Sequence, residues 1–105
     1  MATTDPILIK YRAALTEMYG DRIERVVLFG SRARGDAKED SDYDVALFLK
    51  DLDDVWLEVR RIVDIQIAIL EENDADIHTL PFPAGHWRDP ASPLMFEIRK
   101  DGLEL

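Results

Sequence analysis

The sequence predicts an α/β (α+β) fold, in which a small mixed β-sheet of three to four strands is flanked by helices. Two short apolar runs, ended by glycine or polar residues, have the length and composition of buried strands, and a third short segment alternates apolar and polar residues before a proline. The longer segments around them repeat apolar residues at helical spacing, and two of these segments open with a cap residue followed by proline. The 105 residues are expected to form a single domain, residues 1–105.

The composition excludes several classes of protein. The chain has no cysteine, so disulfides, thiolate metal sites and cysteine nucleophiles are ruled out. No apolar stretch approaches the length of a membrane span, and the start of the chain lacks the pattern of a signal peptide, so the cytoplasm is the expected location. A net charge of -9 disfavours long nucleic acid as a substrate, because binding a phosphate backbone requires a basic surface. A basic protein partner, or a small nucleotide that carries its own Mg²⁺, fits this charge better.

The first helix is expected to begin at Asp5, which caps it, and Pro6, and to end at Gly20. Its apolar stripe consists of Ile7, Leu8, Tyr11, Leu15, Met18 and Tyr19. Residues 26–29 are β-branched or bulky and predict the first strand, which stops at Gly30.

A second strand is predicted over residues 45–49, after a charged loop. The next segment has Asp53 as its expected N-cap and the apolar stripe Val55, Val59, Ile62, Val63, Gln66 and Leu70. Residues 63–69 also alternate as a strand would, but the length of the segment without glycine or proline favours a helix. A helix that ends early and passes into a strand is the alternative.

The third strand is predicted over residues 75–80, with Asp76 and His78 on one face and Pro81 as its end. A connection rich in proline follows. Ser92 and Pro93 then begin the last helix, Gly102 ends it, and residues 103–105 are the candidate for an edge strand.

Two carboxylates at the start of the second strand face a Gly-Ser turn at the end of the first. Asp42 and Asp44 are two residues apart, so in a strand they point to the same face. They repel each other unless a cation lies between them, and Mg²⁺ suits carboxylate and phosphate oxygens. Gly30 lets backbone N–H groups approach a phosphate, and Ser31 can donate its hydroxyl. This pattern predicts a metal–nucleotide site.

Three further residues, two arginines and a histidine, are each open to more than one interpretation. Arg32 and Arg34 suit bidentate binding of triphosphate oxygens, but they also suit a surface role, or in the case of Arg34 an ion pair that anchors the loop. Ser31 is the stronger candidate for a phosphate contact. His78 shares a face with Asp76 and can approach the site, although such a histidine is more often a partly buried sheet residue.

These motifs resemble the signature of the DNA polymerase β-like nucleotidyltransferase superfamily and, more narrowly, its minimal nucleotidyltransferase (MNT) domains. The resemblance rests on Gly30-Ser31, on residues 32–36 and on residues 41–44 at the family's spacing. It implies the polymerase β-like nucleotidyltransferase fold. It also implies that Asp76 is the third carboxylate of a metal cluster with Asp42 and Asp44 and takes the proton from the attacking hydroxyl. An ordinary aspartate at the start of a strand is the alternative for Asp76.

The resemblance further implies the transfer of AMP from ATP at a site with two Mg²⁺ ions. Small MNT proteins resemble the antitoxin half of HEPN–MNT toxin–antitoxin pairs, in which AMP is placed on a tyrosine of the HEPN ribonuclease toxin. A hetero-oligomer with such a toxin is therefore expected. Two alternatives remain at this point: a stoichiometric antitoxin that neutralises the toxin by binding alone, and a small-molecule nucleotidyltransferase of the antibiotic-modifying type.

Overall fold

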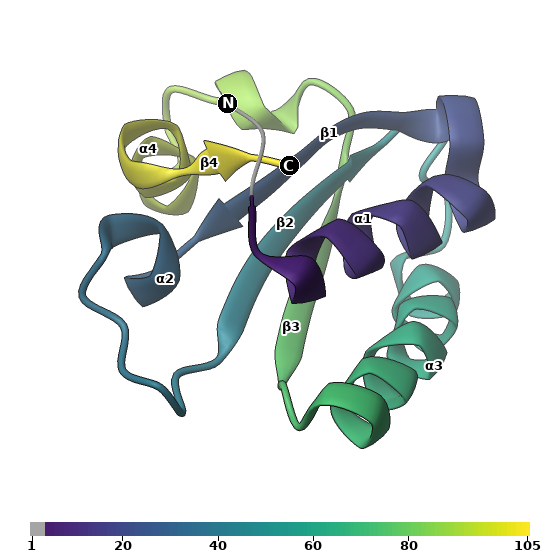
Figure 1. Ribbon diagram of the computed structural model, residues 1–105. Coiled ribbons are helices and arrows are strands. Elements are labelled where there is room, and N and C mark those ends of the chain that lie inside the picture. Colours follow the sequence, from purple (N-terminus) through teal and green to yellow (C-terminus); the bar gives the residue numbers. More distant parts are fainter. Residues whose placement is uncertain (1–3) are drawn as a thin grey trace.

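The computed structural model describes residues 4–105 and contains a four-stranded mixed sheet with helices on both faces (Figure 1). The strand order is β3 (Ile77–Pro83), β2 (Tyr43–Leu49), β1 (Ile23–Phe29), β4 (Leu103–Glu104). β1 pairs antiparallel with both β2 and β4, whereas β2 pairs parallel with β3. The expected fold class is confirmed, and so is the edge strand near the C-terminus. The elements are α1 (Pro6–Tyr19), η1 (Gly20–Arg22), β1 (Ile23–Phe29), α2 (Ser31–Arg34), β2 (Tyr43–Leu49), α3 (Val55–Asn73), β3 (Ile77–Pro83), η2 (His86–Arg88), α4 (Pro93–Asp101) and β4 (Leu103–Glu104).

Two hydrophobic cores lie on opposite faces of the sheet because side chains alternate along β2. The larger core joins α1 and α3 to the sheet and includes Leu15, Val45, Leu47, Ile62 and Ile77. The smaller core lies under α4 and consists of Val27, Ala46, Phe48, Met95 and Ile98. Asp44 precedes Ala46 by two residues, so it lies on the same side of the sheet as α4, near the start of β2.

The helix ends follow the predicted chemistry. The amide of Ile7 donates to Asp5 Oδ1 over 2.9 Å, and the amide of Met95 donates to Ser92 Oγ over 3.2 Å. Each cap is followed by proline in the first turn, where its missing N–H is not needed. Gly20 ends α1 as expected. No helix within residues 4–105 combines the length and apolar character needed to cross a membrane, and residues 1–3, part of the start considered for a signal peptide, lie outside the described chain.

The strands differ from the predictions at their ends. β1 begins at Ile23 instead of residue 26, because its pairing with β2 extends as far as Leu49. β3 starts at Ile77 and does not stop at Pro81: its parallel pairing with β2 continues to Pro83. Prolines are tolerated there because β3 is an edge strand with one side free of ladder partners.

The segment with two possible interpretations is a helix along its whole length, so the alternative of an early change to a strand is wrong. Its N-cap is Asp54, whose Oδ1 accepts from Leu57 N over 3.1 Å, instead of Asp53. The buried residues of α3 are Glu58, Ile62 and Ile69, so the face that packs is rotated relative to the predicted stripe. The rotation leaves several apolar side chains of the stripe on the surface.

Glu58 is a buried carboxylate held in a network of hydrogen bonds and ion pairs, which the sequence alone does not predict. It is 3% exposed, and it accepts from Arg22 Nη2 at 2.8 Å, from Arg61 Nη1 at 3.1 Å and from Tyr19 OH at 3.3 Å. We expect Glu58→Ala to lower the free energy of unfolding by about 1–3 kcal/mol, because it removes two ion pairs and leaves the buried Tyr19 hydroxyl without its acceptor. Urea denaturation measures this change.

The matched control for that substitution is Glu71→Ala, at an exposed position of the same helix. Its effect should stay within about 0.5 kcal/mol. Equal losses for the two variants would show that the Glu58 network contributes nothing beyond helix propensity.

Candidate functional site

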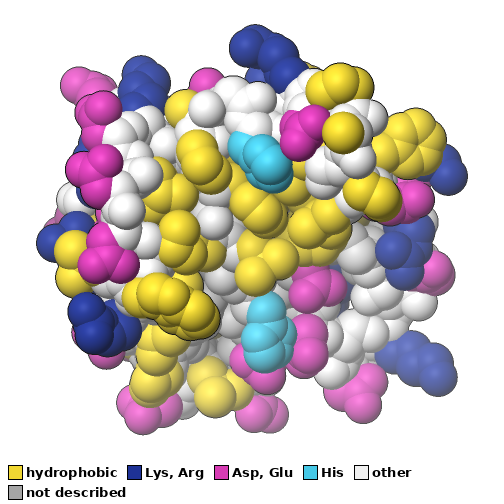
Figure 2. Space-filling view, turned by 180° about the vertical axis from the view of Figure 1, so that it is seen from behind, with side chains coloured by type: hydrophobic (Ala, Val, Ile, Leu, Met, Phe, Trp, Pro, Cys, Tyr) yellow, Lys and Arg dark blue, Asp and Glu magenta, His cyan; other side chains and the backbone are white. Residues whose placement is uncertain are grey.

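Four polar side chains meet where β2 and β3 begin. The parallel register pairs Asp44 with His78. Asp42 and Asp76 each immediately precede their strand, and the amide of Tyr43 donates to the carbonyl of Asp76 over 2.9 Å. Residues two apart share a face of a strand, so all four belong to the side of the sheet that carries α4. Figure 2 views this side and shows apolar side chains gathered across it, with a histidine next to acidic side chains at their border.

Three of these residues form a cluster with the spacing of metal ligands. His78 Nε2 lies 3.4 Å from Asp42 Oδ2 and 3.3 Å from Asp76 Oδ2. One ligand atom from each of the three lies within 4.8 Å of the others, and all three residues are exposed to solvent. Two carboxylates and an imidazole are a donor set that fits a divalent cation. The sequence predicted that His78 shares a face with Asp76, but it did not identify His78 as a metal ligand. The spacing of two residues between them was the signal that could have indicated this role.

Asp44 lies against the turn that ends β1. It pairs with Phe29 across the antiparallel ladder, and a Cβ added to Gly30 would lie 2.5 Å from Asp44 Oδ2. Burial raises the pKa of the Asp44 carboxyl; His78 opposes this rise, and the negative charge of Asp42 adds to it. A cation nearby would therefore stabilise the ionised form of Asp44. Any side chain larger than that of glycine at position 30 would collide with the Asp44 carboxylate.

The turn after β1 supplies backbone amides next to Asp44. Gly30 has φ +76°, which favours glycine, and its carbonyl accepts from the amides of Ala33 and Arg34, both over 3.1 Å. Ser31 and Arg32 are the first two residues of α2. Amides at the start of a helix have no acceptor within that helix, so these two N–H groups are available to a ligand. Such a turn is suited to a phosphate.

The two arginines of the motif are engaged with the loop that follows. Arg32 donates from Nε to the carbonyl of Ser41 over 2.9 Å and from Nη2 to that of Glu39 over 3.1 Å. Arg34 Nε lies 3.3 Å from Asp36 Oδ2, which is the kind of ion pair considered as the alternative for this residue. Both arginines thus hold the loop in this arrangement, and a direct contact with phosphate stays a prediction.

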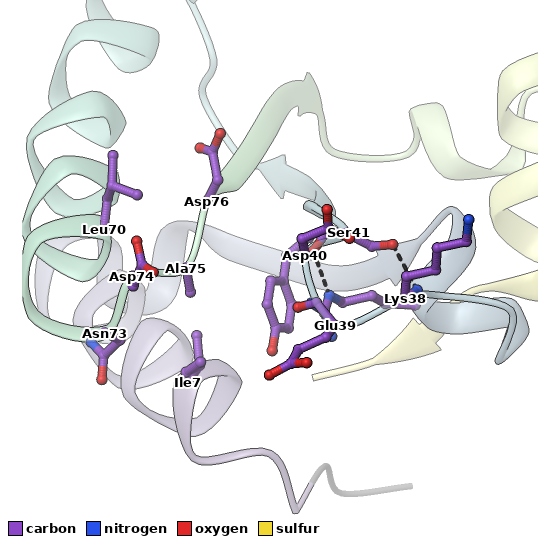
Figure 3. A pocket seen from close by; sticks show the side chains of 12 residues that line it. Ile7, Lys38, Glu39, Asp40, Ser41, Leu70, Asn73, Asp74, Ala75 and Asp76 are labelled. Atoms are coloured by element: carbon purple, nitrogen blue, oxygen red, sulfur yellow. Dashed lines mark hydrogen bonds between the residues drawn. The ribbon is translucent and has the colours of Figure 1, made fainter.

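A cleft of about 1050 Å³ lies between residues 38–41 and the C-terminal end of α3, and it reaches the cluster of Asp42, Asp76 and His78 at Asp76 (Figure 3). Ile7, Leu70 and Ala75 form its apolar part. Of the predicted site residues, only Arg32 and Asp76 line it. Asp76 therefore lies between two surfaces, the cleft and the face that carries Asp44.

Comparison with known proteins gives matches of three kinds: a relative in sequence, solved structures and a family profile. The Methanocaldococcus jannaschii protein provisionally named protein adenylyltransferase MJ0141 is 39% identical over 46 residues, which is 44% of this chain and 46% of that protein. The match thus spans less than half of that relative.

Two solved structures share the fold. A chain from a toxin–antitoxin complex with AMP-PNP has a TM-score of 0.61 at 19% identity, over 90% of this chain and 69% of that one. A chain from a complex of tri-AMPylated Shewanella oneidensis HEPN toxin with MNT antitoxin has a TM-score of 0.52 at 15% identity, over 93% of this chain and 70% of that one.

The sequence profile of one family covers most of the chain. The profile described as polymerase beta, nucleotidyltransferase matches residues 13–102, a range that contains the turn at Gly30 and all four polar residues at the start of β2 and β3. The chain belongs to the polymerase β nucleotidyltransferase family.

Proposed function

We propose that this chain transfers AMP from ATP to a hydroxyl of a protein partner in a reaction that depends on Mg²⁺. Two observations carry this proposal: Asp42 and Asp76 cluster with His78 at ligand spacing, and Asp44 is held against Gly30, near enough to Asp42 and His78 for both to influence its pKa. Carboxylates this close to one another, with a partly buried one next to them, are what a divalent cation with a phosphate chain would neutralise.

Each residue of the site has a proposed role. Asp42, Asp44 and Asp76 would hold Mg²⁺, whose oxygen preference matches their donors. Gly30 and Ser31 would bind the phosphates beyond the α-phosphate through backbone amides and the serine hydroxyl. When bound, the metal supplies positive charge that offsets the charge of the triphosphate and of the leaving group.

The proposed reaction is a direct displacement at the α-phosphorus, which needs few further residues of the protein. The acceptor oxygen forms a bond to the α-phosphorus, the bond to the bridging oxygen of the β-phosphate breaks, and pyrophosphate leaves. Asp76, whose side chain is 51% exposed and therefore accessible to an acceptor, would take the proton of the hydroxyl. Positioning and charge neutralisation provide most of the rate enhancement in this type of transfer.

For the partner we propose a HEPN-type toxin, with this chain as its antitoxin, a tyrosine as the acceptor and a hetero-oligomer as the working assembly. Support comes from the structural neighbours, since one is a toxin–antitoxin complex with AMP-PNP and another contains an AMPylated HEPN toxin beside an MNT antitoxin. The net charge of -9 is compatible with a basic partner.

The test is transfer of label from ATP carrying ³²P at the α-phosphate. The full chain, the protein encoded by the neighbouring gene, and Mg²⁺ should give labelled partner, and mass spectrometry of its peptides should place AMP on a tyrosine. Chelation of Mg²⁺ with EDTA should stop the transfer. Neutralisation of the toxin without any label would contradict the proposal in favour of binding alone, and label on a small-molecule hydroxyl would contradict the choice of partner.

A further inference from the structure

We propose that His78 is a ligand of the metal bound at Asp42 and Asp76, and that its imidazole makes the site prefer Mn²⁺ to Mg²⁺. This inference rests on the proposed function and specifies the metal of that site. It is carried by the position of the Nε2 atom, which faces both carboxylates at nearly the same distance, 3.4 Å and 3.3 Å.

These two distances fit shared ligation better than hydrogen bonding. A charge-assisted N–H···O bond is about 2.7–2.9 Å long, clearly shorter than either separation. Neighbouring ligands of an octahedral ion with bonds of about 2.1 Å lie about 3 Å apart. The carboxylate oxygens and Nε2 therefore need to move only slightly to surround one ion.

The backbone fixes this arrangement in advance. His78 lies within β3 and pairs with Asp44 in the parallel ladder, so its side chain leaves the same face as those of Asp42 and Asp76. Asp76 immediately precedes the strand, and its carbonyl accepts from the amide of Tyr43 over 2.9 Å. Both strands are thus joined at the level of the cluster, which limits the loss of freedom when an ion binds.

The nitrogen donor decides which ion is favoured. Mg²⁺ is a hard cation that binds oxygen ligands and keeps several waters. Imidazole suits first-row transition ions, whereas carboxylates and water suit both Mg²⁺ and Mn²⁺. A site that adds one imidazole to the aspartate carboxylates therefore accepts Mn²⁺ without loss of any ligand, while Mg²⁺ gains little from the nitrogen.

Electron spin echo envelope modulation of Mn²⁺ bound to the full-length, untagged chain tests the proposal without nucleotide or partner. We expect ¹⁴N modulation from a directly bound imidazole, replaced by ¹⁵N modulation when the protein carries ¹⁵N-labelled histidine. His78→Gln should lose the signal and bind Mn²⁺ about tenfold more weakly, with the affinity for Mg²⁺ changed by less than about twofold.

The second histidine of the chain provides the matched control. His86 lies in η2, next to Asp89 and away from the cluster, so His86→Gln should keep the modulation and both affinities. Bound Mn²⁺ without nitrogen modulation, or unchanged selectivity in His78→Gln, would overturn the inference while leaving AMP transfer possible. Failure of the proposed function would appear differently, as absence of labelled partner with either metal.

Discussion

Replacing Asp44 by asparagine should lower AMP transfer by at least about a hundredfold and raise the melting temperature of the metal-free protein. Activity falls because a charge that binds the metal is removed at nearly constant volume. Stability rises because burial raises the pKa of Asp44, so that its ionised form is disfavoured in the folded state at neutral pH. Labelled-ATP transfer and thermal denaturation in EDTA measure the two effects.

The stability effect has a defined pH dependence. The pKa of Asp44 is higher in the folded than in the unfolded chain, so wild-type stability falls as pH rises through the two values. The gain from Asp44→Asn should therefore be full at pH 7 and vanish well below the ordinary aspartate pKa of about 3.9. Asp64→Asn, at an exposed position of α3, is the control and should change neither property. A less stable Asp44→Asn variant, or one with normal transfer, would contradict this account.

Replacing Gly30 by alanine should both destabilise the fold and disable the site. The residue has φ +76° and ψ −158°, a region open essentially to glycine alone, so strain of about 1–3 kcal/mol is expected. The new Cβ would also lie 2.5 Å from Asp44 Oδ2 and must displace that carboxylate. We expect transfer to fall by at least about tenfold under conditions where the variant is fully folded by circular dichroism.

Gly20→Ala separates strain from the contact with Asp44. Gly20 also has a positive φ, +53°, with a ψ outside the left-handed helical region, but a Cβ there would meet nothing within 4 Å. This variant should lose stability to a similar extent and keep its transfer activity. If both glycine variants lost activity equally, the close approach of Gly30 to Asp44 would have no special role.

Much of the fold follows from local signals in the sequence. The caps at Asp5 and Ser92, the glycine that ends α1, and the apolar run of β2 are determined by residues close to one another in the chain. The shared face of Asp42 and Asp44 follows from the period of a strand, and the parallel pairing adds Asp76 to it.

Features that depend on partners distant in the sequence were not predicted. Pro81 lies inside β3 because that strand is at the edge of the sheet, a position that only the strand order reveals. Glu58 is buried because Arg22 and Tyr19, far away in the sequence, lie beside it. The contact of His78 with both Asp42 and Asp76 depends on the register between β2 and β3, which no local pattern specifies.

The most direct test of the central claim is a crystal structure of this chain with Mn²⁺ and a non-hydrolysable ATP analogue, with anomalous scattering used to locate the metal. The account predicts an anomalous peak among the carboxylates of Asp42, Asp44 and Asp76, with the triphosphate on the turn at Gly30. A metal peak away from these carboxylates, or a nucleotide seated in the cleft between Ile7 and Leu70, would contradict it.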